Sequence, residues 1–306
     1  MDKFPDLLRW FENSGYYIED NCKRIDFTFK DNLTDELIEE FAREYAKYIC
    51  RIRCNGPQRP FFDSDEDLCE KFQNVIDDRV ILTEREKEFL RVSIFFEGMI
   101  SQTKFNETND FKGSIDRDGF NGYFGESLFY IIKEQYLEDE KIIVEPSLPK
   151  ASAKGTGLDY MEIRRSNSSN DLYFTIGEIK TTKNGIGSYP NKIINQLIER
   201  PKHLYNSHIN AFKEFARLSS DSELKEFVDT IPRYFWNPKI TDKKRYAAII
   251  NHNYEENQRK NPFQDFQEAA ADTINSNPEC RRIKLVAIKN IENIKEKVLD
   301  YIWRNL

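Results

Sequence analysis

The spacing of apolar residues predicts a chain of alternating strands and helices. A period of two, typical of a β-strand, is clearest at residues 172–182 (LYFTIGEIKTT). Similar short runs predict further strands at 23–30, 142–148, 158–164, 245–254 and 281–291. Apolar residues three and four apart predict helices at 33–50, 82–100, 120–137, 191–200, 263–276 and 291–306, and an amphipathic segment at 203–218. The pattern favours an α/β fold with a mixed β-sheet flanked by helices.

A change in this pattern divides the chain. The first part is mainly helical, and residues 106–119 are polar and rich in Gly and Asp, which indicates a loop or a domain seam. We therefore expect a mainly α-helical N-terminal region at 1–115 and an α/β domain at 116–306.

Composition indicates a folded protein, with 39% hydrophobic and 32% charged residues. No apolar run approaches the roughly 20 residues that span a bilayer, and the first residues lack the apolar stretch of a signal peptide, so we expect a cytoplasmic protein without a membrane partner. The five cysteines form no CxxC pair, which favours reduced thiols without a structural metal. The net charge of −7 repels nucleic acid, so binding to it requires a local basic surface, a metal ion or a partner.

Two charged residues extend the apolar stripe of the strand at 172–182. Leu172, Phe174 and Ile176 share one face, and the next positions on that face are Glu178 and Lys180. Charged groups at the end of a buried stripe need partners. One interpretation is a salt-bridged strand end where the sheet meets water; the other is a functional pair.

A third charged residue favours the functional interpretation. Asp159 is in phase with Met161 and Ile163 in the preceding predicted strand, and a polar turn at 166–171 joins that strand to the next. Pairing of the two strands would place Asp159 opposite Glu178, where the two carboxylates repel each other unless a cation lies between them. Mg²⁺ (or Mn²⁺) suits such a pair. Turn chemistry after Gly157 is the alternative role for Asp159.

A further acid lies upstream on the predicted helix at 120–137. Glu126 has aromatic neighbours at helical spacing, namely Tyr123, Phe129 and Tyr130. A carboxylate on an otherwise aromatic face either binds a cation or accepts hydrogen bonds, so Glu126 is a candidate additional metal ligand. The alternative is a favourable position near the helix N-terminus.

These residues together resemble the core of the PD-(D/E)xK nuclease superfamily. The resemblance covers about residues 120–200: Glu126 on a helix, Asp159 in GLD at a strand start, Glu178 and Lys180 as EIK on the next strand, and Gln196 on the following helix. It implies a restriction-endonuclease-like core in which Asp159 and Glu178 hold Mg²⁺, Lys180 is the catalytic lysine, Glu126 is an accessory ligand and Gln196 has a supporting role.

Within that superfamily the chain resembles the HamA-like nuclease subunit of the Hachiman bacterial anti-phage system more than it resembles RecB-like members. The order FGE, GLD and GEIK after an additional N-terminal region carries this likeness, which implies a helicase-like protein partner. Arg200 follows Gln196 where RecB-like members have Tyr, and no Pro precedes Asp159, so the sequence departs from the RecB-like pattern.

Basic residues are concentrated around the candidate site, although the chain as a whole has a negative net charge. Residues 179–203 contain five basic side chains against the single acid Glu199. Besides Lys180, they are the candidate DNA-binding residues Lys183, Lys192, Arg200 and Lys202. The sequence therefore predicts a metal-dependent DNA nuclease acting with a partner. A stand-alone restriction or repair endonuclease and a non-catalytic protein-binding scaffold are the alternatives.

Overall fold

A computed structural model describes most of the chain. The described residues are 4–19, 22–55, 83–84, 88, 92, 96, 98–136, 140–144, 159–166, 169–187, 189–199, 205–237, 243–253, 281–288 and 290–305. The elements in chain order are η1 (Leu7–Arg9), β1 (Phe11–Glu19), β2 (Cys22–Phe29), α1 (Asp35–Asn55), α4 (Gln102–Thr108), α5 (Arg117–Tyr136), β3 (Glu140–Val144), β4 (Tyr160–Ser166), β5 (Leu172–Thr182), α6 (Tyr189–Glu199), α7 (Asn206–Leu218), α8 (Ser222–Trp236), β6 (Lys244–Asn253), β7 (Arg281–Ile288) and α10 (Ile291–Asn305).

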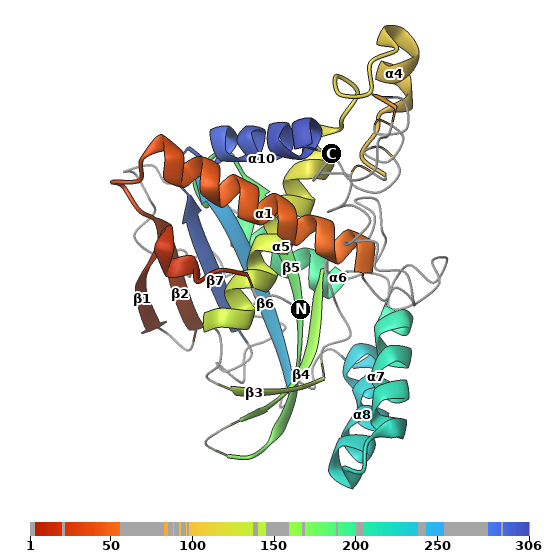
Figure 1. Cartoon of the computed structure of the whole chain (residues 1–306). Helices are drawn as coiled ribbons and strands as arrows, with labels where there is room; N and C mark the ends of the chain where they lie inside the picture. Colours follow the sequence, from red (N-terminus) through yellow and green to blue (C-terminus); the bar gives the residue numbers. More distant parts are fainter. Residues whose placement is uncertain are drawn as a thin grey trace.

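A seven-stranded mixed sheet forms the centre of the molecule (Figure 1), with the order β1-β2-β7-β6-β5-β4-β3. The central strands β2, β7, β6 and β5 run parallel to one another. The outer pairings are antiparallel: β1 pairs with β2 at one edge, and β3 pairs with β4 and β4 with β5 at the other. The predicted α/β fold with a mixed sheet flanked by helices is confirmed.

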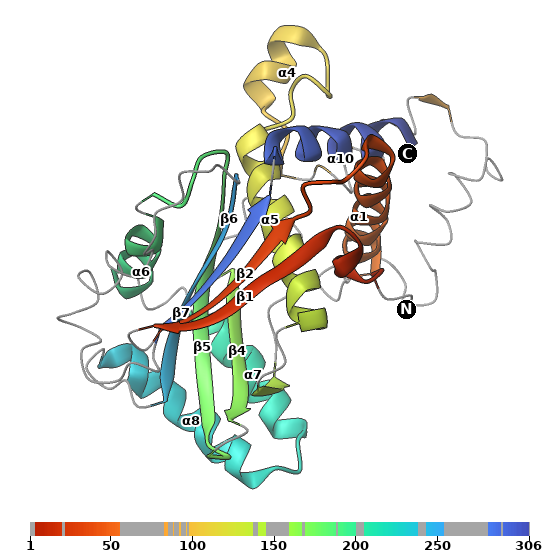
Figure 2. The ribbon, with the colours of Figure 1, turned by 90° about the vertical axis from the view of Figure 1, so that its left-hand side faces the viewer.

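Helices cover both faces of this sheet (Figure 2). The side chains of Ile179, Ile249 and Val286 pack on one face in a core that also contains residues of α1, α5 and α10. The alternate side chains of β5, such as Phe174 and Ile176, pack on the other face with α6, α7 and α8. The period of two in the strands thus supplies two separate apolar layers.

The sequence predicted most of these elements. The structure gives β5 the predicted bounds, and α5, α6, α7 and α10 begin and end within a few residues of prediction. Strand β1 and helix α8 were not predicted, although Asp221 caps α8 and its apolar residues have helical spacing. Pro232 lies inside α8, and a proline usually signals a helix end. The predicted helices at 82–100, in large part, and at 263–276 lie outside the described residues.

The N-terminal residues are part of the same sheet as the rest of the chain. Strand β2 pairs in parallel with β7, so residues 11–29 extend the sheet that contains β5. Helix α1 packs beside α10 (Figure 1), which joins the two ends of the chain in one layer. The boundary at 115/116 therefore does not separate two sheets, and a mainly helical 1–115 stays a prediction because residues 56–82 are not described.

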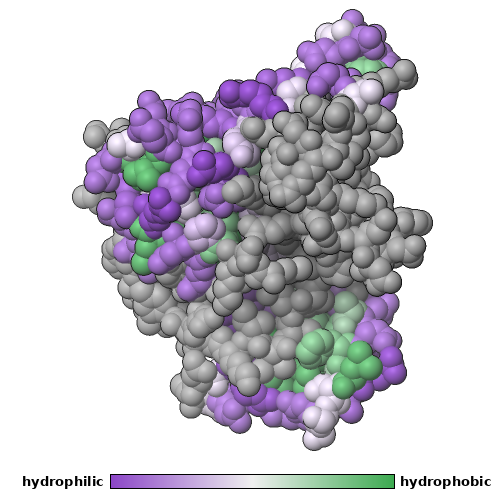
Figure 3. Space-filling model, viewed as in Figure 1, coloured by the Kyte–Doolittle hydropathy of each residue, from purple (hydrophilic) through white to green (hydrophobic). Residues whose placement is uncertain are grey.

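The described surface in the view of Figure 3 is mostly polar, and its broadest apolar area lies over α7 and α8. Phe215 and Leu218 near the end of α7 are exposed, as is Trp236 at the end of α8. No helix among the described residues has the length and apolar character needed to cross a membrane.

Candidate functional site

The strand pair β4 and β5 is an antiparallel hairpin that positions the predicted acids. Its register pairs Tyr160 with Gly177 and Ile163 with Phe174. Continuing this register by one residue places Asp159 opposite Glu178, as the sequence predicted. The turn that fixes the register is closed by the hydrogen bond from Ser166 N to Asp171 O, and Asn170 adopts a positive φ of 59°.

Asp159 lies at a bend just before β4 begins, and its side chain is only 5% exposed. Its Oδ2 accepts a hydrogen bond of 3.0 Å from the backbone N–H of Ile179. That N–H belongs to the residue between Glu178 and Lys180, beyond the last main-chain pair of the ladder. The carboxylate is thereby held at the point where the two strands part.

Glu178 and Lys180 form an ion pair on one face of β5. Lys180 Nζ lies 2.9 Å from Glu178 Oε1, and the Glu178 side chain is 7% exposed while that of Lys180 is 34% exposed. The ammonium therefore reaches solvent above a buried carboxylate. A salt-bridged strand end and a catalytic pair are both compatible with this contact, so the ion pair by itself does not distinguish the two interpretations.

Asp159, Glu178 and Lys180 lie on one face of the sheet, near the carboxyl end of β5. Met161 of β4 and Ile176 of β5, which are in phase with them, pack in the core beneath α6, α7 and α8. Because β5, β6 and β7 are parallel, their carboxyl ends meet near this site. Ligands of open α/β sheets bind beyond the carboxyl ends of strands, so the location suits a substrate site.

Helix α5 packs against the same end of β5 and β6 from the opposite face of the sheet, and Gly125 permits this close approach. A Cβ at Gly125 would lie 1.8 Å from Thr181 Oγ1 and 2.6 Å from Asn251 Nδ2, so only glycine fits here. Glu126 follows directly and is buried, with 9% of its surface exposed. One turn later Tyr130 Oη donates a hydrogen bond of 3.2 Å to the carbonyl oxygen of Asp159. Glu126 therefore lies on the helical segment that contacts the strands of the site.

The donor atoms suit a hard divalent cation. Asp159 and Glu178 offer carboxylate oxygens, and Mg²⁺ binds one or two carboxylates and completes its shell with water and phosphate oxygens. Across the described residues, no three His, Cys, Asp or Glu side chains gather in a group that could hold a metal ion. Glu126 therefore does not complete a three-carboxylate cluster with Asp159 and Glu178 in this structure, and its role as a ligand stays a prediction.

The remaining predicted residues lie around α6. Lys183 is exposed in the loop after β5, and Lys192 is exposed on α6 with its Nζ 5.6 Å from the centre of the Tyr189 ring. Gln196 is also exposed on α6, so no buried contact supports its predicted role. Arg200 and Lys202 lie outside the described residues.

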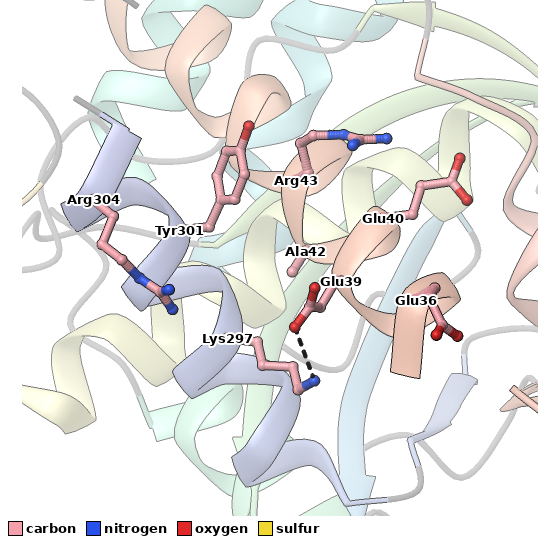
Figure 4. A pocket seen from close by; sticks show the side chains of 8 residues that line it. All are labelled: Glu36, Glu39, Glu40, Ala42, Arg43, Lys297, Tyr301 and Arg304. Carbon is pink, nitrogen blue, oxygen red and sulfur yellow. Dashed lines mark ion pairs between the residues drawn. The ribbon is translucent and has the colours of Figure 1, made fainter. Parts of the chain in front are cut away.

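A separate pocket lies between α1 and α10 (Figure 4). Its lining contains both acids and bases, and Lys297 Nζ lies 3.7 Å from Glu39 Oε1. Both helices cover the face of the sheet opposite to Glu178 and Lys180. This pocket is therefore not part of the carboxylate site.

Two residues of the site's framework were missed from the sequence. The sequence shows Tyr130 only as an aromatic neighbour of Glu126, because its hydroxyl contacts Asp159, which is 29 residues away along the chain. Gly125 carried a signal, since an isolated glycine inside a helical pattern often marks a close approach. The pattern alone did not say what approaches it.

Comparison with known proteins identifies one family. The sequence model of the family described as HamA matches residues 16–302, nearly the whole chain. No curated protein matches the sequence.

Proposed function

Because the chain belongs to the HamA family, and is thus a component of the Hachiman anti-phage defence system with protein partners, we propose that it is the nuclease of that system. The proposed reaction is divalent-metal-dependent hydrolysis of DNA phosphodiester bonds. The proposal rests on the position of three side chains, Asp159, Glu178 and Lys180, near the carboxyl end of β5. Glu178 and Lys180 form an ion pair, and Asp159 accepts a hydrogen bond from the backbone N–H of the residue between them.

Each of these side chains has a distinct proposed role. Asp159 and Glu178 would hold Mg²⁺ (or Mn²⁺), which polarises the scissile phosphate and lowers the pKa of its bound water. A third of the Lys180 side chain is exposed, so its ammonium is accessible to a substrate that approaches from solvent. Its ammonium then orients the attacking water or stabilises negative charge that develops on the phosphate.

The charge of the chain supports an enzyme delivered by a partner. A net charge of −7 opposes binding to DNA over the whole surface. Lys183 and Lys192 provide exposed positive charge on the loop and helix that follow β5. We propose that these residues, with Arg200 and Lys202, contact the phosphates of DNA, and that a helicase partner supplies the remaining affinity.

A cleavage assay tests the proposal. The native chain, alone and co-expressed with its partner, is incubated with linear and circular DNA and with Mg²⁺ or Mn²⁺. We expect cleavage that EDTA stops, and that Glu178→Gln abolishes. Glu226→Gln removes an exposed acid of α8 and serves as the matched control with native cleavage. Cleavage that survives in Glu178→Gln, or no cleavage by the native complex, contradicts the proposal.

The second candidate function is a non-catalytic scaffold, with which the Glu178–Lys180 ion pair is equally compatible, since that contact also suits a purely structural strand end. A scaffold predicts a native complex that lacks cleavage and whose assembly is weakened by Glu178→Gln. A stand-alone restriction or repair endonuclease instead predicts full cleavage by the chain without any partner.

A further inference from the structure

One polar contact joins helix α5 to Asp159, at the bend just before β4. Tyr130 Oη donates to the carbonyl oxygen of Asp159 at 3.2 Å, and Tyr130 is only 6% exposed. A buried hydrogen-bonding group that loses its partner destabilises the fold by more than the bond itself contributes. The contact is therefore one that the folded chain maintains.

Asp159 accepts hydrogen bonds from two elements, one at its main chain and one at its side chain. Its main-chain oxygen is held by α5, and its Oδ2 is held by the N–H of Ile179 on β5. Asp159 itself lies at a bend just before β4 and one residue beyond the last pair of the β4–β5 ladder. These two bonds therefore contribute to the orientation of its carboxylate.

The position of α5 is fixed on both sides of Glu126. Before it, Gly125 lies against Thr181 and Asn251 so closely that no Cβ fits. After it, Tyr130 contacts Asp159 one helical turn later. A helix held at these two points cannot slide along the strand ends without breaking one contact.

We propose that Tyr130 is a positioning residue for the carboxylate site. Its hydroxyl fixes the bend at Asp159, sets the direction of the Asp159 carboxylate and places Glu126 relative to it. The inference rests on the proposed function, because the carboxylates are taken to bind a divalent cation. Outer partners that orient metal ligands change metal affinity by about 10- to 100-fold when they are removed.

The hydroxyl can be removed without loss of the neighbouring contacts. The ring of Tyr130 also lies 5.6 Å from Lys133 Nζ, and Lys133 pairs with the buried Glu162 at 2.9 Å. Tyr130→Phe keeps the ring and this packing. The packing therefore still anchors α5 in the variant, which removes the hydroxyl that donates to Asp159.

The matched control is Tyr205→Phe. Tyr205 Oη donates a hydrogen bond of 2.8 Å to the carbonyl oxygen of Leu197, and Tyr205 is fully buried. This variant removes a bond of the same chemistry elsewhere in the fold. Both variants should lose similar stability towards urea, so any effect confined to Tyr130→Phe reports on the site.

Two readouts other than activity test the inference. The first is Mn²⁺ binding by calorimetry, for which we expect a Kd about 10-fold higher or more in Tyr130→Phe and a native value in Tyr205→Phe. The second is hydrogen exchange of the Ile179 amide without metal. It should become faster in Tyr130→Phe alone, because the acceptor carboxylate of Asp159 is no longer held.

The outcomes separate this inference from the proposed function. If the native chain binds Mn²⁺, Glu178→Gln abolishes binding and Tyr130→Phe binds like the native chain with unchanged Ile179 exchange, the positioning role is overturned while the metal site stands. If native binding of Mn²⁺ does not depend on Glu178 or Asp159, the proposed function fails. Faster Ile179 exchange in Tyr130→Phe still supports the positioning of Asp159 in that case.

Discussion

The carboxylate of Asp159 accepts a hydrogen bond of 3.0 Å from the backbone N–H of Ile179, so a side chain takes the place of main chain where β4 and β5 part. Ile179 is 4% exposed, which means that its N–H has little access to water as an alternative partner. Asp159 thus has a structural bond and a proposed chemical role at the same time.

These two roles can be separated by substitution. Asp159→Asn keeps an amide oxygen that can accept from Ile179 N–H, but it removes the ligand charge. We expect a free energy of unfolding close to native in urea. Metal-dependent cleavage should fall by about 100-fold or more, because cation binding contributes several kcal/mol to catalysis and each 1.4 kcal/mol is about tenfold in rate.

Asp159→Ala removes both roles. The Ile179 N–H is then buried without its acceptor, at a cost of about 1–3 kcal/mol. Urea denaturation should show Asp159→Ala to be less stable than Asp159→Asn by that amount, with cleavage lost in both. Equal stability of the two variants would show that the bond to Ile179 contributes nothing to the fold.

Lys180 should affect the chemical step more than metal binding. Lys180→Met removes the positive charge beside Glu178, so the affinity for Mn²⁺ is expected to stay native or to increase. Single-turnover cleavage should slow by about 10²–10⁴-fold, the usual effect of losing a proton-transfer group. Lys180→Arg keeps the charge with a different geometry and should recover only part of the rate. A loss of Mn²⁺ binding in Lys180→Met contradicts the assigned role.

Gly125 and Gly122 give a matched pair within α5. Gly125→Ala places a Cβ 1.8 Å from Thr181 Oγ1, and we expect a loss of about 1–3 kcal/mol or more from overpacking. A Cβ at Gly122 has no neighbour within 4 Å, so Gly122→Ala should stabilise the helix by roughly 0.5–1 kcal/mol. Chemical denaturation of both variants measures the difference, which should exceed 1 kcal/mol.

Shortening Thr181 should relieve part of the Gly125→Ala defect. Thr181→Ala removes the hydroxyl that meets the new methyl group, while Asn251 Nδ2 remains close. The double variant is therefore expected to be more stable than Gly125→Ala alone. If Thr181→Ala adds its own loss in full, the two residues are not in the contact that the structure shows.

The sequence was most informative where a local period decides the structure. The alternation along β5 placed Glu178 and Lys180 on one face, and the short turn before β5 placed Asp159 opposite them. Contacts between distant segments were not readable: the Tyr130 hydroxyl meets a residue on another element, and Gly125 meets two strands. Strand β1 and helix α8 were missed because their local signals are weak or interrupted, as by Pro232.

Ionisation of the buried Tyr45 is expected to lower the stability of the folded chain at alkaline pH. Tyr45 is fully buried in the core beside α5 and its hydroxyl donates to the carbonyl oxygen of Phe124; burial raises its pKa well above the ordinary value of about 10. The folded chain therefore retains this proton at a pH where the unfolded chain loses it, and the free energy of unfolding falls as pH rises above about 10. Tyr45→Phe loses the hydrogen bond to Phe124, so its free energy of unfolding is lower near pH 8. It has no phenol to ionise at this position, so that free energy falls less steeply above about pH 10. Urea denaturation of both chains at a series of pH values measures the two slopes, and equal slopes would contradict the burial of an ionisable Tyr45.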